Sequence, residues 1–151
     1  MLGLFKKKSL LSGADNKRIV EAIRATEQLT SGEIRVYMES RNPLVSTIER
    51  AQIIFLQLNM HATAQRNGVL LYVATKDKEV ALIGDQGIHQ KVGTEFWNFQ
   101  VNQMIGFFKE NQLTDGMIKC IAQVGEVLIE KFPYDPLTDK NELPDDVVFG
   151  K

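Results

Sequence analysis

The sequence predicts a three-layer α/β/α sandwich around a small mixed central sheet, and three observations support this fold class. Residues 69–74 are apolar and rich in β-formers between turn residues, which is typical of a strand buried on both faces. Residues 79–83 repeat the strand pattern after a short polar connection. Segments with helical spacing of apolar residues precede, separate and follow the strands. Because a strand buried on both faces needs a layer on each side, we expect these helices to cover the sheet.

Composition and size favour a single domain over residues 15–132, between a basic N-terminal tail (1–14) and an acidic C-terminal loop (133–151). Of the 151 residues, 44% are hydrophobic and 25% are charged, which is ordinary for a globular protein. The net charge of −1 gives no general attraction to nucleic acid. No secretory signal and no apolar stretch of ~20 residues are recognised, so we expect no transmembrane segment and a cytoplasmic protein.

The first part of the chain predicts a helix followed by a strand. Residues 17–29 have an apolar stripe that Asp15 or Asn16 can cap, and Ser31 with its following glycine ends the helix. Residues 33–39 then alternate between apolar and polar side chains, which indicates a strand covered fully on one face and partly on the other.

The middle of the chain completes a strand–helix–strand unit. Ser46 and Glu49 have the spacing of a capping box, so a helix is expected over residues 46–58. The strand at 69–74 then follows this crossover and should run parallel to the first strand. The connection to residues 79–83 is too short for a crossover, which makes that strand antiparallel and the sheet mixed.

The remainder of the chain predicts helices and a loop. A helical region is broken by Gly93, and a helix over about 95–110 follows it. Thr114 and Asp115 are expected to cap a last helix that ends near Lys131. Gly125 inside this helix costs roughly 1 kcal/mol against alanine, which suggests close packing at that position.

The predicted strand directions bring polar side chains to one end of the sheet, which we call the rim. The first two strands begin there and the third ends there, so Glu33, Asn67 and Asp85 meet although they are far apart in sequence. Asp115, at the start of the last helix, is expected to close over the same rim if that helix packs antiparallel to its predecessor. Carboxylate and amide oxygens suit a hard cation such as Ca²⁺ or Mg²⁺. The candidate metal ligands are therefore Glu33, Asn67, Asp85 and Asp115.

Each of these residues also has a structural interpretation. Asp115 and Asp85 are good helix caps, and Asn67 before a glycine is a good turn residue. Arg66 can pair with an anion at the rim or form an ordinary surface ion pair. His89 is expected beside the rim and can act there as an acid or base, or serve as a partly exposed structural histidine.

Other catalytic sites find little support in the sequence. His61 and His89 are far apart and have no second ligand at helical spacing, which argues against zinc. The single cysteine, Cys120, lies on a helix without the surroundings of a reactive thiol. Phosphate-binding glycine loops, nucleophile elbows and paired aromatics for base stacking are not recognised.

Three segments together resemble the TPM domain family, which is named after a thylakoid-lumen protein, a photosystem II repair factor and an animal receptor modulator. They are residues 30–36 (TSGEIRV), 66–74 (RNGVLLYVA) and 83–88 (IGDQGI). The later segments 96–97 (FW), 132–134 (FPY) and 141–145 (NELPD) resemble the short stand-alone bacterial branch of the family. The resemblance spans about residues 15–149.

The resemblance implies an α/β/α sandwich and divalent cations bound in loops at one end of the sheet, with Glu33, Asn67 and Asp85 at recurrent positions. The preferred hypothesis is a non-catalytic Ca²⁺- or Mg²⁺-binding domain that acts through an unknown protein partner. The resemblance also implies an alternative, a metal-dependent acid phosphatase that hydrolyses phosphomonoesters, in which Asp85 or His89 carries protons. Many relatives have an export signal and a membrane anchor, whereas neither is recognised here.

Overall fold

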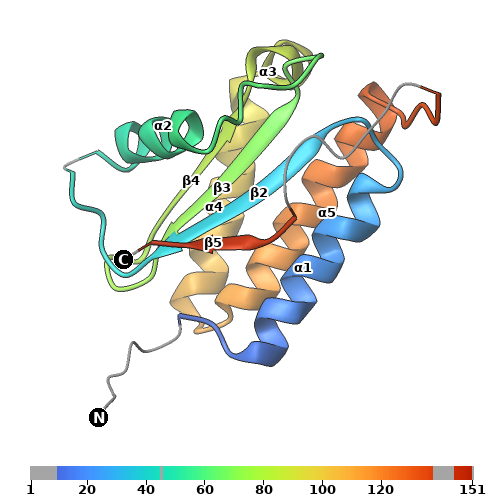
Figure 1. The fold of residues 1–151 in the computed structure, drawn as a ribbon. Helices are drawn as coiled ribbons and strands as arrows, with labels where there is room; N and C mark the ends of the chain where they lie inside the picture. Colours follow the sequence, from blue (N-terminus) through green and yellow to red (C-terminus); the bar gives the residue numbers. More distant parts are fainter. Residues whose placement is uncertain (1–9, 45, 138–144, 151) are drawn as a thin grey trace.

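The computed structural model describes residues 10–44, 46–137 and 145–150, and its four strands form one sheet with helices on both faces (Figure 1). In chain order the elements are α1 (Gly13–Glu27), β2 (Glu33–Glu39), α2 (Thr47–Gln57), β3 (Gly68–Ala74), β4 (Glu79–Gly84), α3 (Gln86–Val92), α4 (Thr94–Lys109), α5 (Leu113–Lys131) and β5 (Val147–Phe149). The predicted fold class is confirmed.

The sheet is mixed, with strand order β4-β3-β2-β5. β2 and β3 are parallel, and β4 is antiparallel to β3, as the lengths of their connections predict. The three-residue strand β5 pairs parallel to β2 on its other side. It lies in the segment that the sequence analysis expected to be a loop, because three residues are too few to show a strand pattern.

The larger core lies between the sheet and the three helices α1, α4 and α5. It contains the alternate residues Ile34, Val36 and Met38 of β2, together with the matching apolar positions of β3 and β4. Figure 1 shows α1 and α5 side by side along this face, and the two helices are in extensive contact. Gly125 of α5 lies against α1, where an added Cβ would be 2.7 Å from Thr26 Oγ1, so the predicted close packing is confirmed.

The opposite face of the sheet is covered by α2, which packs mainly on β4 and β3. Its Ala51, Ile54 and Phe55 form a second core with Leu70 and Tyr72 of β3. Beyond these apolar residues lies a buried polar network. The guanidinium of Arg50 donates two hydrogen bonds of 2.8 Å to Glu39, and the Tyr72 hydroxyl donates to the same carboxylate.

The helix ends agree with the sequence in part. Ser46 Oγ accepts a hydrogen bond from Glu49 N, so the predicted cap of α2 is confirmed. The cap of α1 is Ser12, and α1 begins four residues earlier than expected. The predicted cap of α5 is wrong, because α5 begins at Leu113 and Asp115 lies inside its first turn. Within the described ranges, no helix is both long and apolar enough to span a bilayer.

Candidate functional site

Glu33 and Asp85 lie in one row across three strands at the rim of the sheet. Glu33 of β2 is paired with Gly68 of β3, and Asp85 N donates a 2.9 Å hydrogen bond to Gly68 O from the other side. Residues opposite each other in a sheet have their side chains on the same face. Because Ile34 points into the helical core, its neighbour Glu33 faces the α2 side, and Asp85 shares that face. The rim therefore presents two acidic residues separated by a glycine.

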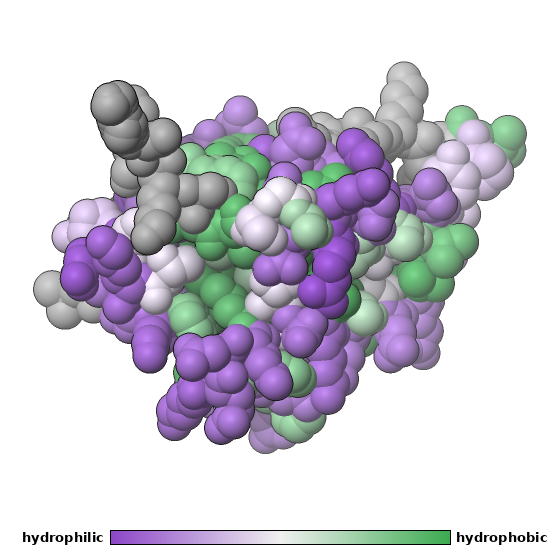
Figure 2. All heavy atoms as spheres, turned by 90° about the horizontal axis from the view of Figure 1, so that it is seen from below, coloured by the Kyte–Doolittle hydropathy of each residue, from purple (hydrophilic) through white to green (hydrophobic). Residues whose placement is uncertain are grey.

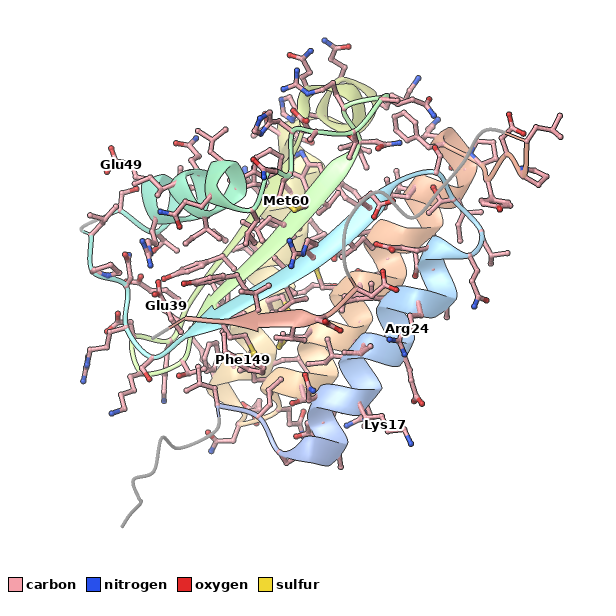
Figure 3. All side chains as sticks on the ribbon, viewed as in Figure 1. Lys17, Arg24, Glu39, Glu49, Met60 and Phe149 are labelled. Atoms are coloured by element: carbon pink, nitrogen blue, oxygen red, sulfur yellow. The ribbon has the colours of Figure 1, made fainter. Side chains whose placement is uncertain are left out.

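A backbone carbonyl group occupies the space above that glycine. A Cβ atom on Gly68 would lie 2.7 Å from Met60 O, so this oxygen sits over the middle of the Glu33–Gly68–Asp85 row. Figure 3 shows Met60 beside β3. The segment after α2 thus brings a neutral oxygen between the two acidic positions. The strand spacing places the backbones of Glu33 and Asp85 about 10 Å apart, which leaves room between them for an ion and its water ligands.

Asp85 already has a cationic partner. Arg66 Nε lies 2.7 Å from Asp85 Oδ2, and Arg66 Nη2 lies 3.0 Å from Oδ1, which is a two-point contact. These hydrogen bonds raise the pKa of Arg66. Asp85 also caps α3, because Oδ1 accepts a hydrogen bond from Gln86 N. Both the cap and the ion pair that the sequence allows are present.

The turn before β3 is held tightly against α3. Gly87 N donates a 2.8 Å hydrogen bond to Arg66 O. A Cβ atom on Gly87 would lie 2.1 Å from Gln65 O and 2.6 Å from Arg66 O, so only glycine fits at this position. The φ angle of Arg66 is 52°, a left-handed conformation that is unfavourable for a residue with a side chain. Close packing therefore fixes the backbone on which the ion pair is built.

Asn67 lies at the rim, but it is one position away from the row. Strand alternation turns it toward the helical face, where its Nδ2 donates to Ser31 Oγ at 3.3 Å. Gln65 Nε2 donates to the same hydroxyl oxygen at 3.0 Å. Asn67 Oδ1 is a buried acceptor that receives no hydrogen bond. It lies next to the row in sequence but on the opposite face of the sheet.

Asp115 is at the opposite end of the molecule, so the expectation that it closes over the rim is wrong. Its Oδ1 is 2.9 Å from Arg18 Nη2 in the first turns of α1, and the neighbouring Thr114 hydroxyl donates to Asp15. α4 begins near the rim and runs away from it, so a helix antiparallel to α4 must begin at the far end. Figure 2 looks onto that end and shows hydrophobic patches between hydrophilic residues.

A second group of carboxyl side chains lies where β5 joins β2, and the sequence analysis did not predict it. Glu27 Oε2 accepts a 2.7 Å hydrogen bond from Ile34 N, and the Glu27 carboxyl group is hydrogen-bonded to Asp145. Burial, helped by this bond and by the charge of Glu33, raises the pKa of Glu27 to about 10. Glu27 therefore carries a proton at neutral pH. Asp145 reaches Glu27 because β5 pairs with β2. No local sequence pattern predicts this contact.

Arg35 follows Glu33 on the same face of β2 and is buried. Burial lowers its pKa, while the charges of Asp146, Glu27 and Glu33 act in the opposite direction. Its Nε atom has no hydrogen-bond partner. The positive charge of Arg35 offsets part of the negative charge of the nearby carboxylates.

His89 and Cys120 have structural surroundings. His89 Nδ1 accepts a 3.0 Å hydrogen bond from Trp97 Nε1, which leaves the proton of a neutral ring on Nε2. Trp97 in turn packs against Gly84 at the end of β4. Cys120 is buried, and burial raises the pKa of its thiol to about 12, so it is not a thiolate at neutral pH.

The oxygens of the rim suit a hydrated cation. In the described parts of the chain, no three Asp, Glu, His or Cys side chains converge to hold a metal ion. Mg²⁺ is nevertheless often held by one or two carboxylates while it keeps several water ligands. Glu33, Asp85 and Met60 O supply that kind of oxygen set on the α2 face of the sheet. Asn67 Oδ1 lies on the other face and is not part of it.

The comparisons with known proteins agree with this fold. The family model of the TPM domain matches residues 4–127. Among curated proteins, none matches the chain. The NMR structure of BA42 protein from the psychrophilic bacterium Bizionia argentinensis is similar at a TM-score of 0.86 and 36% sequence identity, over 96% of this chain and 99% of that chain.

Two more distant NMR structures share the fold alone. The N-terminal domain of a P. gingivalis protein matches at a TM-score of 0.67 and 18% identity, over 84% of this chain and 83% of that chain. The N-terminal domain of cg2496 protein from Corynebacterium glutamicum matches at 0.58 and 14% identity, over 79% and 74%.

Proposed function

The chain belongs to the TPM domain family, and from this premise we propose that it is a non-catalytic domain that binds Ca²⁺ or Mg²⁺ at the rim and acts through a protein partner. One observation carries the proposal. Glu33 and Asp85 share one face of the sheet on either side of Gly68, and the carbonyl oxygen of Met60 lies over that glycine. Two acidic residues and a carbonyl oxygen from separate parts of the chain thus lie at one end of the sheet, and this arrangement supports the proposal.

Burial makes these two carboxylates good partners for a cation. Glu33 is 3% exposed and Asp85 is 7% exposed. A negative charge in such surroundings loses much of its hydration and is stabilised by a nearby positive charge. Because the protein supplies few ligands, water must complete the coordination shell. We expect weak affinity, on the order of 10⁻⁴–10⁻³ M, as in the weaker protein calcium sites.

The enzymatic alternative is supported less well by the contacts of its proposed proton carriers. A metal-assisted phosphomonoesterase needs Asp85 or His89 to exchange protons with substrate or water. Asp85 is held by Arg66 at two points, and the Nδ1 atom of His89 is engaged by Trp97. Hydrolysis of a generic phosphomonoester that is lost with chelator and in Asp85→Asn would reverse this preference.

The proposal is tested by titrating the protein with Ca²⁺ and Mg²⁺ while backbone amide NMR signals are recorded. We expect saturable shifts at Glu33, Gly68 and Asp85, which weaken in Glu33→Gln because one anionic ligand is removed. Asp115→Asn is the matched control, since it removes the same charge at the far end of the molecule and should leave the titration unchanged. Absence of shifts at the rim at millimolar metal would refute the proposal.

A further inference from the structure

The guanidinium group of Arg66 binds the Asp85 carboxylate, where a bound divalent cation would also have to bind. It contacts both oxygens of the carboxylate, at 2.7 and 3.0 Å. The side chain of Arg66 is 43% exposed, whereas that of Asp85 is 7% exposed. We infer that Arg66 is an internal competitor that closes the rim and must release Asp85 before a divalent cation binds there. This inference rests on the proposed function and adds a regulatory step to it.

The local geometry allows the side chain to leave while the backbone stays in place. Arg66 O is held by Gly87 N at 2.8 Å, and Arg66 N donates to Thr63 O at 3.2 Å. The left-handed φ of 52° is therefore maintained by contacts that do not involve the guanidinium. Since the side chain already reaches solvent, its rotation needs only changes of side-chain torsions, and the released charge becomes hydrated.

A comparison with Arg50 shows why this behaviour is specific to Arg66. The pair of Arg50 and Glu39 has similar two-point geometry, but its side chains are 17% and 4% exposed. It is also joined by the Tyr72 hydroxyl. Release of Arg50 would leave buried charges without their ionic partners in the layer under α2. Release of Arg66 leaves its guanidinium group at the surface, where water can hydrate it. One pair is structural and the other is exchangeable.

The competition makes a quantitative prediction about affinity. A divalent cation at Asp85 has to break the Arg66 ion pair, so the apparent affinity is lower than that of the open site. Arg66→Gln removes the competitor and should tighten Ca²⁺ or Mg²⁺ binding by about 2–5-fold, which corresponds to the usual strength of a partly exposed ion pair. Arg66→Lys keeps the charge without two-point contact, so its affinity should fall between those two proteins.

The experiment is a titration of the wild type, Arg66→Gln and Arg41→Gln with Ca²⁺ and Mg²⁺, followed by the amide signals of Asp85 and Gln86. Arg41→Gln is the matched control, because Arg41 forms a 2.9 Å ion pair with Asp77 at the opposite end of the sheet. Both variants change the net charge equally. We expect tighter binding only in Arg66→Gln.

The outcomes separate the two proposals. Equal or weaker binding in Arg66→Gln, with clear binding by the wild type, overturns the competitor role and leaves the proposed function intact. No binding by any protein overturns both. Binding by Arg66→Gln alone supports the competitor role in its strongest form. If Arg66→Gln does not fold, the Nε–H signal of Arg66 in the wild type decides: it should shift and lose protection as metal is added, and an unchanged signal in a metal-bound protein overturns the inference.

Discussion

Glu27 shows at the scale of one residue how burial couples folding to pH. Its pKa in the folded state is about 10, against an ordinary value of 4.5. Between these values the unfolded chain has released the proton and the folded chain has kept it, so stability falls as pH rises. The contribution is complete below pH 4.5 and is lost progressively up to pH 10.

We therefore predict that Glu27→Gln stabilises the protein at neutral pH. The amide keeps an acceptor for Ile34 N and a donor for Asp145, but it does not ionise in the unfolded chain. The gain between pH 4.5 and 7 is at most roughly 3 kcal/mol. Urea denaturation at pH 5 and pH 8 checks it, with exposed Glu21→Gln on the same helix as control. A gain that does not grow with pH would contradict the assignment.

Arg50 gives a second prediction at this scale. Arg50→Ala removes the cationic partner of the buried Glu39 carboxylate and leaves it the hydrogen bond from the Tyr72 hydroxyl, so a loss of about 3 kcal/mol is expected. The exposed pair of Arg41 and Asp77 provides the control, and Arg41→Ala should cost less than about 0.5 kcal/mol. Chemical denaturation measures both. Similar losses in the two variants would show that burial does not distinguish these ion pairs.

At the scale of elements, the rim depends on how α3 docks onto the turn before β3. Asp85 caps α3 and Gly87 contacts the backbone of the turn, so one short helix positions both partners of the ion pair. The register of β3 and β4 determines which residue at the start of β3 lies opposite Asp85. The four-residue turn pairs Ala74 with Glu79, and counting back along both strands places Gly68 opposite Asp85.

Gly87→Ala tests this docking. The new methyl group would meet the carbonyl oxygens of Gln65 and Arg66, which belong to the backbone and cannot turn aside. A loss of about 1–3 kcal/mol is expected, together with changed amide shifts at Asp85. Gly106→Ala in α4 is the control: an added Cβ there meets nothing within 4 Å, and better helix propensity should stabilise by about 1 kcal/mol. Equal effects would disprove the close contact.

At the scale of the whole molecule, much of the sheet could be predicted from sequence. The apolar run of β3, the alternation in β2 and the lengths of the two connections determine that β2 and β3 are parallel and that β4 is antiparallel. These are local properties. The spacing of apolar residues indicates which faces of a strand are buried, and the length of a connection limits whether the next strand can be parallel. The same reasoning brings Glu33 and Asp85 to one rim, and the structure places them there.

The tertiary structure decided the features that depend on packing between distant segments. The pairing of β5 with β2 places Asp145 beside Glu27, and the start of α5 at the far end separates Asp115 from the rim. The contact of Arg66 with Asp85 depends on the left-handed turn that Gly87 holds in place. Sequence by itself determined the main helices, the three longer strands and the directions of those strands, because short-range patterns encode burial. The partners of Glu27 and Asp115 were decided only in the fold, because those contacts join residues that no local pattern connects.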